Sequence, residues 1–329
     1  MVHLFLISVQ IIDRTPPSQN TDNLTMVTGF YLMGFSNTWE LQVLHAMSFL
    51  LIYLVALIGN LLIFILITLD GHLHTPMYFF LKNLSFLDLC FISVTVSKSI
   101  ENSLSRSCSI SFFGCVLQVF LVVLFAGSEI LLLMVMSYDR YIAICQPLHY
   151  ETIMNKRFCR RMATSSWLIG GLLGAMYSGS TFSLPFCGPK EIHQFFCDVP
   201  SLLKISCAET HIAVDVSVAF GITLGIFCCI SIAISYGHIF STVLKIPTTE
   251  GRSKAFSTCL PHLIVLMVFI TTGIMSYIKP PLDSDSVLDL SLSMLYTVAP
   301  PTLNPVNYSL RNRDMKMSLM KLLTCKHFS

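Results

Sequence analysis

The sequence predicts an all-α membrane protein built as a bundle of seven transmembrane helices. Hydrophobic residues make up 54% of its 329 residues and charged residues only 12%, against roughly 25% charged residues in soluble domains. Seven stretches are mainly apolar over about 20 residues, the length that crosses a bilayer as a helix. The alternating ten-residue pattern of membrane β-barrels is absent. The net charge of +2 gives no reason to expect a nucleic-acid partner.

The apolar stretches also set the predicted organisation of the chain. In order, they are Leu44–Thr68, Met77–Val96, Val116–Met136, Met162–Phe182, Ile212–Phe240, Ala255–Ile278 and Val287–Leu310. We therefore expect an N-terminal tail over residues 1–43, a seven-helix domain over residues 44–310 and a C-terminal tail over residues 311–329.

The placement of lysine and arginine predicts the orientation of the bundle. With the N-terminus outside, thirteen of the twenty basic residues lie on the cytoplasmic side and six outside. This excess predicts an extracellular N-terminus and a cytoplasmic C-terminus. The remaining one, Lys82, lies within the second span, and we expect its amine to extend toward the cytoplasmic face. In the C-terminal tail Met315, Leu319 and Leu322 share one face, as in a short amphipathic helix at the membrane surface.

The N-terminal tail carries a predicted glycosylation site at Asn23, in the sequence Asn-Leu-Thr. Its first residues, MVHLFLISVQII, are apolar but lack a basic start and a clear cleavage site. We expect the first helix to act as an uncleaved signal-anchor, with a cleaved signal peptide as the alternative.

Five of the twelve cysteines lie in predicted outer segments: Cys108, Cys115, Cys187, Cys197 and Cys207. These segments face an oxidising compartment, whereas the other cysteines should stay reduced. Five cysteines allow two bridges and leave one over. Three of them lie in the long loop after the fourth span, so at least one bridge should hold that loop. No outer pair has the double CxxC spacing of a zinc site.

Four polar residues, Asn60, Asp88, Glu129 and Asn304, fall inside the predicted spans. Because a helix rises 1.5 Å per residue, Glu129 lies roughly 16 Å deeper than Arg140, and Asp88 reaches a similar depth. Ionisable groups at this depth are costly and indicate function. Two neighbouring acids there must share a proton, keep one acid protonated or bind a cation. A neutral hydrogen-bonded pair that only packs helices together is the alternative.

Six motifs follow one another along almost the whole chain after the N-terminal tail. They are Gly59-Asn60, LHTPMYFFLKNLSFLDLC, MSYDRYIAICQPLHY, SYGHIF, KAFSTCLPHL and PPTLNPVNYSLRN. Together they resemble the olfactory receptors, which are rhodopsin-like G-protein-coupled receptors. The segment LTMVTGFYLMGFSNTWELQ further resembles olfactory receptor family fourteen. The chain departs from the usual pattern at Ser97, where a proline is common, and at Ile270, where a tyrosine is common.

The resemblance implies an odorant receptor of the plasma membrane, not an enzyme, and no cofactor. Its implied partners are a small volatile odorant, a stimulatory olfactory-type G protein that raises cyclic AMP, and membrane lipid. An intramembrane enzyme would need a catalytic cluster, whereas Cys145 and His149 lack further partners. A transporter could use Asp88 and Glu129, but the chain has no evident inverted repeats.

The resemblance also implies a set of residues that switch the receptor toward its G protein. They are Asp139, Arg140, Tyr141, Tyr236, Asn304, Pro305 and Tyr308. We expect Arg140 to end the third helix at the cytoplasmic face, held by a charge-assisted hydrogen bond to Asp139. Simple interfacial roles, a positive anchor for Arg140 and an aromatic belt for the tyrosines, are the alternatives. The same resemblance implies sodium binding near Asp88 and Glu129.

Counting from these motifs places a ligand cavity in the outer half of the bundle. Its predicted lining is apolar with two hydroxyl groups, as small-molecule pockets tend to be: Val122, Val123, Ala126, Gly127, Phe220, Leu224, Ile274, Tyr277, Met294 and Thr297. Ordinary helix packing is the alternative for each residue. Asp215 near the start of the fifth span is expected to be wetted at the interface, although it could recruit an amine.

The resemblance finally implies how the outer cysteines pair. It predicts bridges between Cys115 and Cys197 and between Cys187 and Cys207, which leaves Cys108 as the odd thiol.

Overall fold

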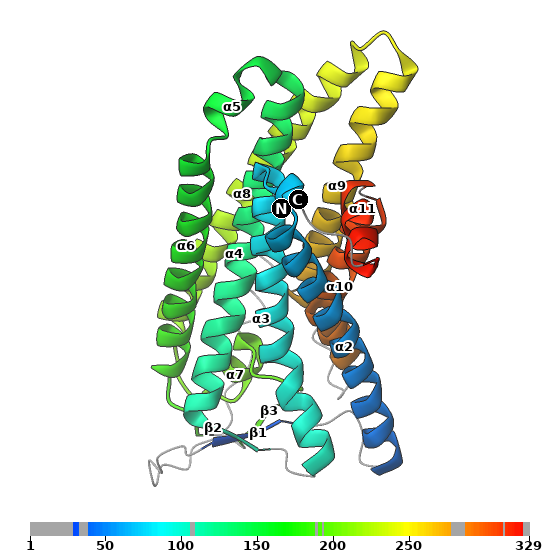
Figure 1. The fold of residues 1–329 in the computed structure, drawn as a ribbon. Coiled ribbons are helices and arrows are strands. Elements are labelled where there is room, and N and C mark those ends of the chain that lie inside the picture. Colours follow the sequence, from blue (N-terminus) through cyan, green and yellow to red (C-terminus); the bar gives the residue numbers. More distant parts are fainter. Residues whose placement is uncertain are drawn as a thin grey trace.

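The structure, a computed structural model, describes residues 29–32, 39–105, 109–187, 190–192, 194–277, 287–311 and 313–324. Within these residues, seven helices of 25 residues or more form the bundle (Figure 1). They are α2 (Trp39–Leu69), α3 (Pro76–Ser105), α4 (Phe112–Cys145), α6 (Lys156–Phe182), α8 (Ile212–Leu244), α9 (Thr249–Tyr277) and α10 (Val287–Arg311). The shorter helices are η1 (Gly71–Leu73), η2 (Pro147–His149), α5 (Tyr150–Ile153), α7 (Val199–Lys204) and α11 (Arg313–Leu323).

The predicted all-α, seven-helix architecture is confirmed, and each predicted span corresponds to one long helix. One expectation was wrong: Arg140 does not end its helix, because α4 continues to Cys145. The residues from Tyr141 to Cys145 contain no helix breaker, and the first one is Pro147. Since proline disfavours helical backbone in the residue before it, the helix ends just ahead of it.

Five of the long helices, α2, α3, α4, α8 and α9, are long and apolar enough to cross a membrane by length and composition. Helix α6 is more polar because glycine, serine and threonine take up much of it. These small residues bring it close to α4. A Cβ atom on Gly170 would clash with Ser128 Oγ, and one on Gly174 would lie 2.6 Å from the Phe120 carbonyl oxygen. Small residues at such contacts let membrane helices approach closely.

A small sheet closes one end of the bundle (Figure 1). Strand β1 (Gly29–Leu32) pairs antiparallel with β2 (Ser109–Ser111) and parallel with β3 (Glu191–Ile192), in the order β2-β1-β3. Phe30 and Leu32 of β1 are buried in the apolar cluster beneath the sheet. The end of the N-terminal tail is therefore packed against the helices. We call this end, which also carries two disulfides, the disulfide end.

At the opposite end, which we call the Arg140 end, α11 packs against α2 and α10. Met315 is buried, and Leu319 and Leu322 pack against the main core, so the predicted amphipathic helix is confirmed. Ser318 on the same face donates a hydrogen bond to Asp70 Oδ2 at 2.5 Å. Lys321 Nζ lies 3.7 Å from the same oxygen. Helix α11 is thus fixed to the α2–α3 connection by apolar and polar contacts together.

Candidate functional site

Arg140 and Asp139 form an ion pair inside α4, with Arg140 Nη2 2.7 Å from Asp139 Oδ2. Tyr150 of α5 donates a second hydrogen bond, 2.8 Å long, to Asp139 Oδ1. Asp139 is almost fully buried, while the Arg140 side chain is 15% exposed. Burial and the Asp139 charge raise the pKa of the Tyr150 hydroxyl, which keeps it protonated as a donor. The carboxylate therefore holds the arginine and the connecting segment after α4 at once.

A second contact joins three helices below this pair. The hydroxyl oxygen of Tyr236 in α8 lies 2.6 Å from His262 Nδ1 in α9. The other ring nitrogen, His262 Nε2, lies 3.1 Å from the carbonyl oxygen of Leu133 in α4. The histidine is buried and both of its nitrogens are partnered. It links the helix that carries Arg140 to α8 and α9.

The other predicted switch residues take different places. Tyr141 lies beside α8, where its ring centre is 5.6 Å from that of His238. Tyr308 is buried in α10, and its hydroxyl has no hydrogen-bond partner among the described residues. Pro305 packs so closely on α2 that a Cβ atom on Gly59 would lie 2.8 Å from Pro305 Cβ. Asn307 donates a hydrogen bond of 2.5 Å to the Pro261 carbonyl, which ties α10 to α9.

The buried polar residues meet between α2, α3, α4 and α10. Asn304 Nδ2 donates to Asp88 Oδ2 at 2.9 Å. Asn60 Nδ2 donates to the Pro301 carbonyl at 2.8 Å. Four buried oxygens, Asn60 Oδ1, Asp88 Oδ1, Glu129 Oε1 and Asn304 Oδ1, have no hydrogen-bond partner among the described residues. Burying an oxygen without a hydrogen bond costs free energy. Oxygen atoms are also the ligands that small, hard cations prefer.

The disulfide end is held by covalent bonds. Cys115 is bonded to Cys197, and Cys187 to Cys207, the same pairs that the resemblance implied. Gln118 reinforces the first bridge: it accepts a hydrogen bond from Cys197 N at 2.9 Å. Its amide donates to the Val94 carbonyl at 2.8 Å.

Two of the predicted site residues in this part of the chain, Cys108 and Asn23, lie outside the described residues.

The loop after Cys187 brings two aromatic residues over the bundle. Phe195 and Phe196 are buried with ring centres 4.9 Å apart. Val122 of α4 and Met294 of α10, both predicted cavity residues, pack against this cluster. Gln118, Phe195 and Phe196 were missed by sequence reasoning. The segment HQFFC beside a predicted bridge cysteine was the available signal for the two aromatic rings.

Other predicted cavity residues are distributed around α4. Ala126 packs against the main core, and Thr297 is fully buried. Val123 and Leu224 pack in the cluster that includes Leu173 and Tyr177 of α6. Phe220 is 45% exposed.

Gly127 was wrongly placed in the cavity. A Cβ atom there would lie 3.1 Å from Leu173 Cδ1 and 3.5 Å from Gly170 Cα, so this position faces α6. The physical reason is the close contact of small residues between α4 and α6, which takes up that face of α4. The side chains of Ile274 and Tyr277 lie outside the described part of the chain.

The helical bundle is that of the rhodopsin-like receptors. A crystal structure of squid rhodopsin superposes with a TM-score of 0.66, covering 89% of each chain at 17% sequence identity. At this identity the match establishes the fold alone.

Sequence comparison defines the family within that class. A sequence profile described as olfactory receptor matches residues 49–326. Olfactory receptor 14A2 of Homo sapiens is 59% identical over 301 residues, covering 92% of this chain and 96% of the relative. Olfactory receptor 14A16 of Homo sapiens is 56% identical, covering 92% of this chain and 98% of the relative. The chain belongs to the olfactory receptor family, and it is therefore a multi-pass plasma-membrane receptor for odorants that acts through a G protein, not an enzyme.

Proposed function

We propose that the receptor binds a small, mostly neutral volatile molecule near the disulfide end and activates a stimulatory G protein that raises cyclic AMP. The observation that carries this proposal is the apolar region beneath the Phe195–Phe196 loop, which includes Val122 and Met294. The side chains gathered there are aromatic and aliphatic, among them Phe49, Phe195 and Val298. An ionised ligand there would lose its hydration without gaining a counter-ion, which costs several kcal/mol. An alcohol, ketone or ester is the better match.

The same proposal includes the orientation of the chain. We place the disulfide end outside the cell, because disulfides form in oxidising compartments, and the Arg140 end in the cytoplasm, because basic residues gather there. The Asp139–Arg140 pair then lies where a cytoplasmic G protein can reach it. Antibody access to an epitope tag before residue 29, with and without permeabilisation, tests the orientation independently of signalling.

The ligand test is a cyclic AMP screen of surface-expressed receptor against neutral volatiles, amines and acids. Val122→Phe should weaken the response to an active neutral ligand about tenfold or more, because it adds bulk beneath the loop. Leu172→Phe is the matched control, since Leu172 lies on α6 and is 57% exposed. A panel dominated by amines, with the response lost in Asp215→Asn, contradicts the neutral-ligand proposal.

We also propose that Asp88, Glu129, Asn60 and Asn304 hold a sodium ion in the resting receptor. The unpartnered oxygens on these four residues support the proposal. One sodium ion would offset a single negative charge, so one of the two acids would keep its proton, and the chain's own amides would orient the ion. Asp88→Asn should abolish the sodium dependence of basal cyclic AMP. An unchanged dependence excludes the sodium site and favours the alternative, a neutral hydrogen-bonded pair that only packs the helices together.

A further inference from the structure

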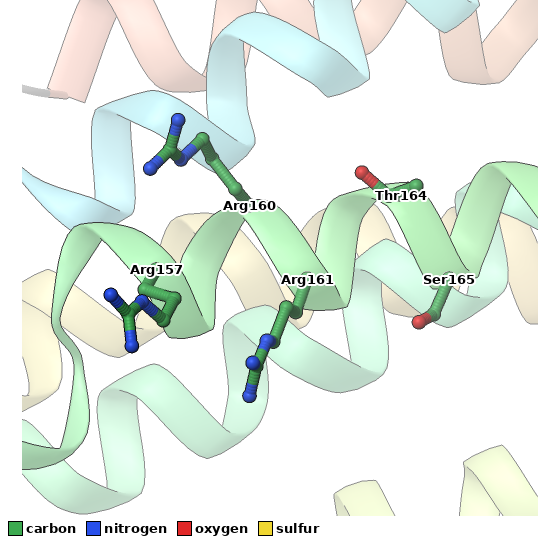
Figure 2. Close-up of a pocket in the computed structure, with 5 residues that line it drawn as sticks. All are labelled: Arg157, Arg160, Arg161, Thr164 and Ser165. Atoms are coloured by element: carbon green, nitrogen blue, oxygen red, sulfur yellow. The ribbon is translucent and has the colours of Figure 1, made fainter.

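Three arginines at the start of α6 form an exposed basic patch. Arg157, Arg160 and Arg161, with Thr164 and Ser165, line a shallow surface groove of about 510 Å³ (Figure 2). Arg157, Arg161 and Ser165 extend from one side of the helix, and Arg160 and Thr164 from the adjacent side (Figure 2). Within the part of the chain that the structure describes, none of these guanidinium groups has an acidic partner. The patch thus offers several N–H donors to an external anion.

The same side of α6 changes from basic to apolar one turn deeper. Arg161, Ser165, Leu168 and Leu172 follow one another at spacings of four, three and four residues, which places them on one face. Leu168 is 68% exposed and Leu172 57% exposed. Exposed leucines on a membrane-spanning helix face acyl chains, because water is absent there. The arginines therefore stand at the membrane surface directly above a lipid-facing stripe.

We infer that this patch is a binding site for the headgroup of an anionic phospholipid in the cytoplasmic leaflet. The inference rests on the orientation proposed above, which places the start of α6 in the cytoplasm. A guanidinium group can donate two parallel hydrogen bonds to a phosphate, which suits Arg157 and Arg161. Ser165 supplies a hydroxyl at the edge of the same groove, and the acyl chains lie along Leu168 and Leu172. Anionic lipids are concentrated in the cytoplasmic leaflet, where basic segments attract them.

An acidic surface of the G protein is the rival partner for the same charges. Two features favour the lipid. The basic groups are continuous with a lipid-facing stripe on the same face, and they lie on α6, whereas the proposed switch residue Arg140 lies on α4. A protein partner would not need the apolar continuation at Leu168 and Leu172.

The test uses purified full-length receptor in lipid nanodiscs that contain phosphatidylcholine with increasing phosphatidylserine, without odorant or G protein. Retention of phosphatidylserine is measured by native mass spectrometry. The variant is Arg157→Gln/Arg161→Gln. The matched control is Lys245→Gln/Lys316→Gln, which removes the same charge from exposed residues elsewhere at the Arg140 end. Thermal unfolding of both variants verifies that the fold is kept.

We expect the arginine variant to lower phosphatidylserine retention about tenfold and the control variant less than twofold. Equal losses in the two variants overturn the site, because they indicate diffuse attraction to the membrane. In a parallel competition experiment, free glycerophosphoserine should displace little phosphatidylserine from the receptor. Full displacement also overturns the inference. Unchanged retention in the arginine variant overturns the lipid site and leaves the acidic protein surface as the rival partner. Because the assay contains no odorant and no G protein, its failure is distinct from failure of the signalling proposal.

Discussion

The two ends of the bundle are held together by different kinds of interaction. The disulfide end has two covalent bridges and a three-stranded sheet that joins segments far apart in the chain. Besides its share of the apolar core, the Arg140 end is held by separate noncovalent side-chain contacts, such as Tyr150 to Asp139 and Tyr236 to His262. Covalent and sheet contacts are lost only with large local disruption, whereas each side-chain contact can break by itself. The comparison suggests that one end keeps its shape while the other can rearrange.

The largest expected effect comes from breaking the covalent end. Cys115→Ser removes the bridge that closes a separation of 82 residues, against 20 residues for Cys187–Cys207. By loop-closure entropy the longer bridge contributes about 1 kcal/mol more than the shorter one. We expect Cys115→Ser to abolish surface display, as measured by flow cytometry of a tagged receptor.

Two controls sharpen that result. Cys187→Ser should reduce surface display less, and Cys90→Ser should leave it nearly unchanged, because Cys90 is a free cysteine of α3. Normal display of Cys115→Ser would show that the sheet and apolar packing hold this end without the bridge.

The next effect concerns signalling at the Arg140 end. Arg140→Ala removes the charged group that the proposal assigns to G-protein activation, while Tyr150 still donates its hydrogen bond to Asp139. We expect surface display near that of the wild type and loss of ligand-evoked cyclic AMP. Asp139→Asn is the contrasting variant: it weakens the hold on Arg140 and should raise basal cyclic AMP. Normal signalling by a displayed Arg140→Ala receptor would remove Arg140 from the switch.

The comparison also explains what the sequence could predict. The seven helices follow from apolar length alone, a signal that does not depend on tertiary contacts. The sheet could not be foreseen, because β1 has four residues and its partners lie about 80 and 160 positions away. The depth of Asp88 and Asn304 could be counted from the helical rise, and the structure joins them by a hydrogen bond.

The direction of a side chain around its helix was harder to predict. Each residue turns the helix by 100°, so a small error in rotation moves a position to another face. Gly127 was assigned to the cavity for this reason, although it faces Gly170. Tyr150 lies eleven residues after Asp139 and reaches it only because η2 and α5 fold back. His262 was within a recognised motif, but its two partners come from two other helices.

A smaller effect is expected at the contact between α8 and α9. Tyr236→Phe removes the hydroxyl and leaves His262 Nδ1 without that partner, which should lower the free energy of unfolding by about 1–3 kcal/mol. The measurement is the thermal unfolding midpoint in detergent. Tyr138→Phe is the control, because Tyr138 is 37% exposed. Equal midpoints for Tyr236→Phe and the wild type would show that water replaces the hydroxyl and that this contact does not hold the Arg140 end.

The smallest effect is a pH dependence where α11 meets the α2–α3 connection. Burial alone would raise the pKa of Asp70, but hydrogen bonds from Ser318 and the His72 backbone, with the nearby Lys321 charge, outweigh it and lower that pKa below 3.8. The folded state therefore favours the ionised carboxylate. Its stabilising contribution is complete at pH values above 3.8 and is lost as the pH falls through the lowered folded-state pKa. At neutral pH, Asp70→Asn should lower the thermal midpoint by roughly 1–3 °C, and the difference from the wild type should shrink as the pH falls below 3.8. Glu151→Gln, which changes an exposed acid at the same end, should show no such difference. If the Asp70→Asn difference is the same at pH 7 and pH 3, the carboxylate's charge does not hold α11, and apolar packing of Met315 is enough.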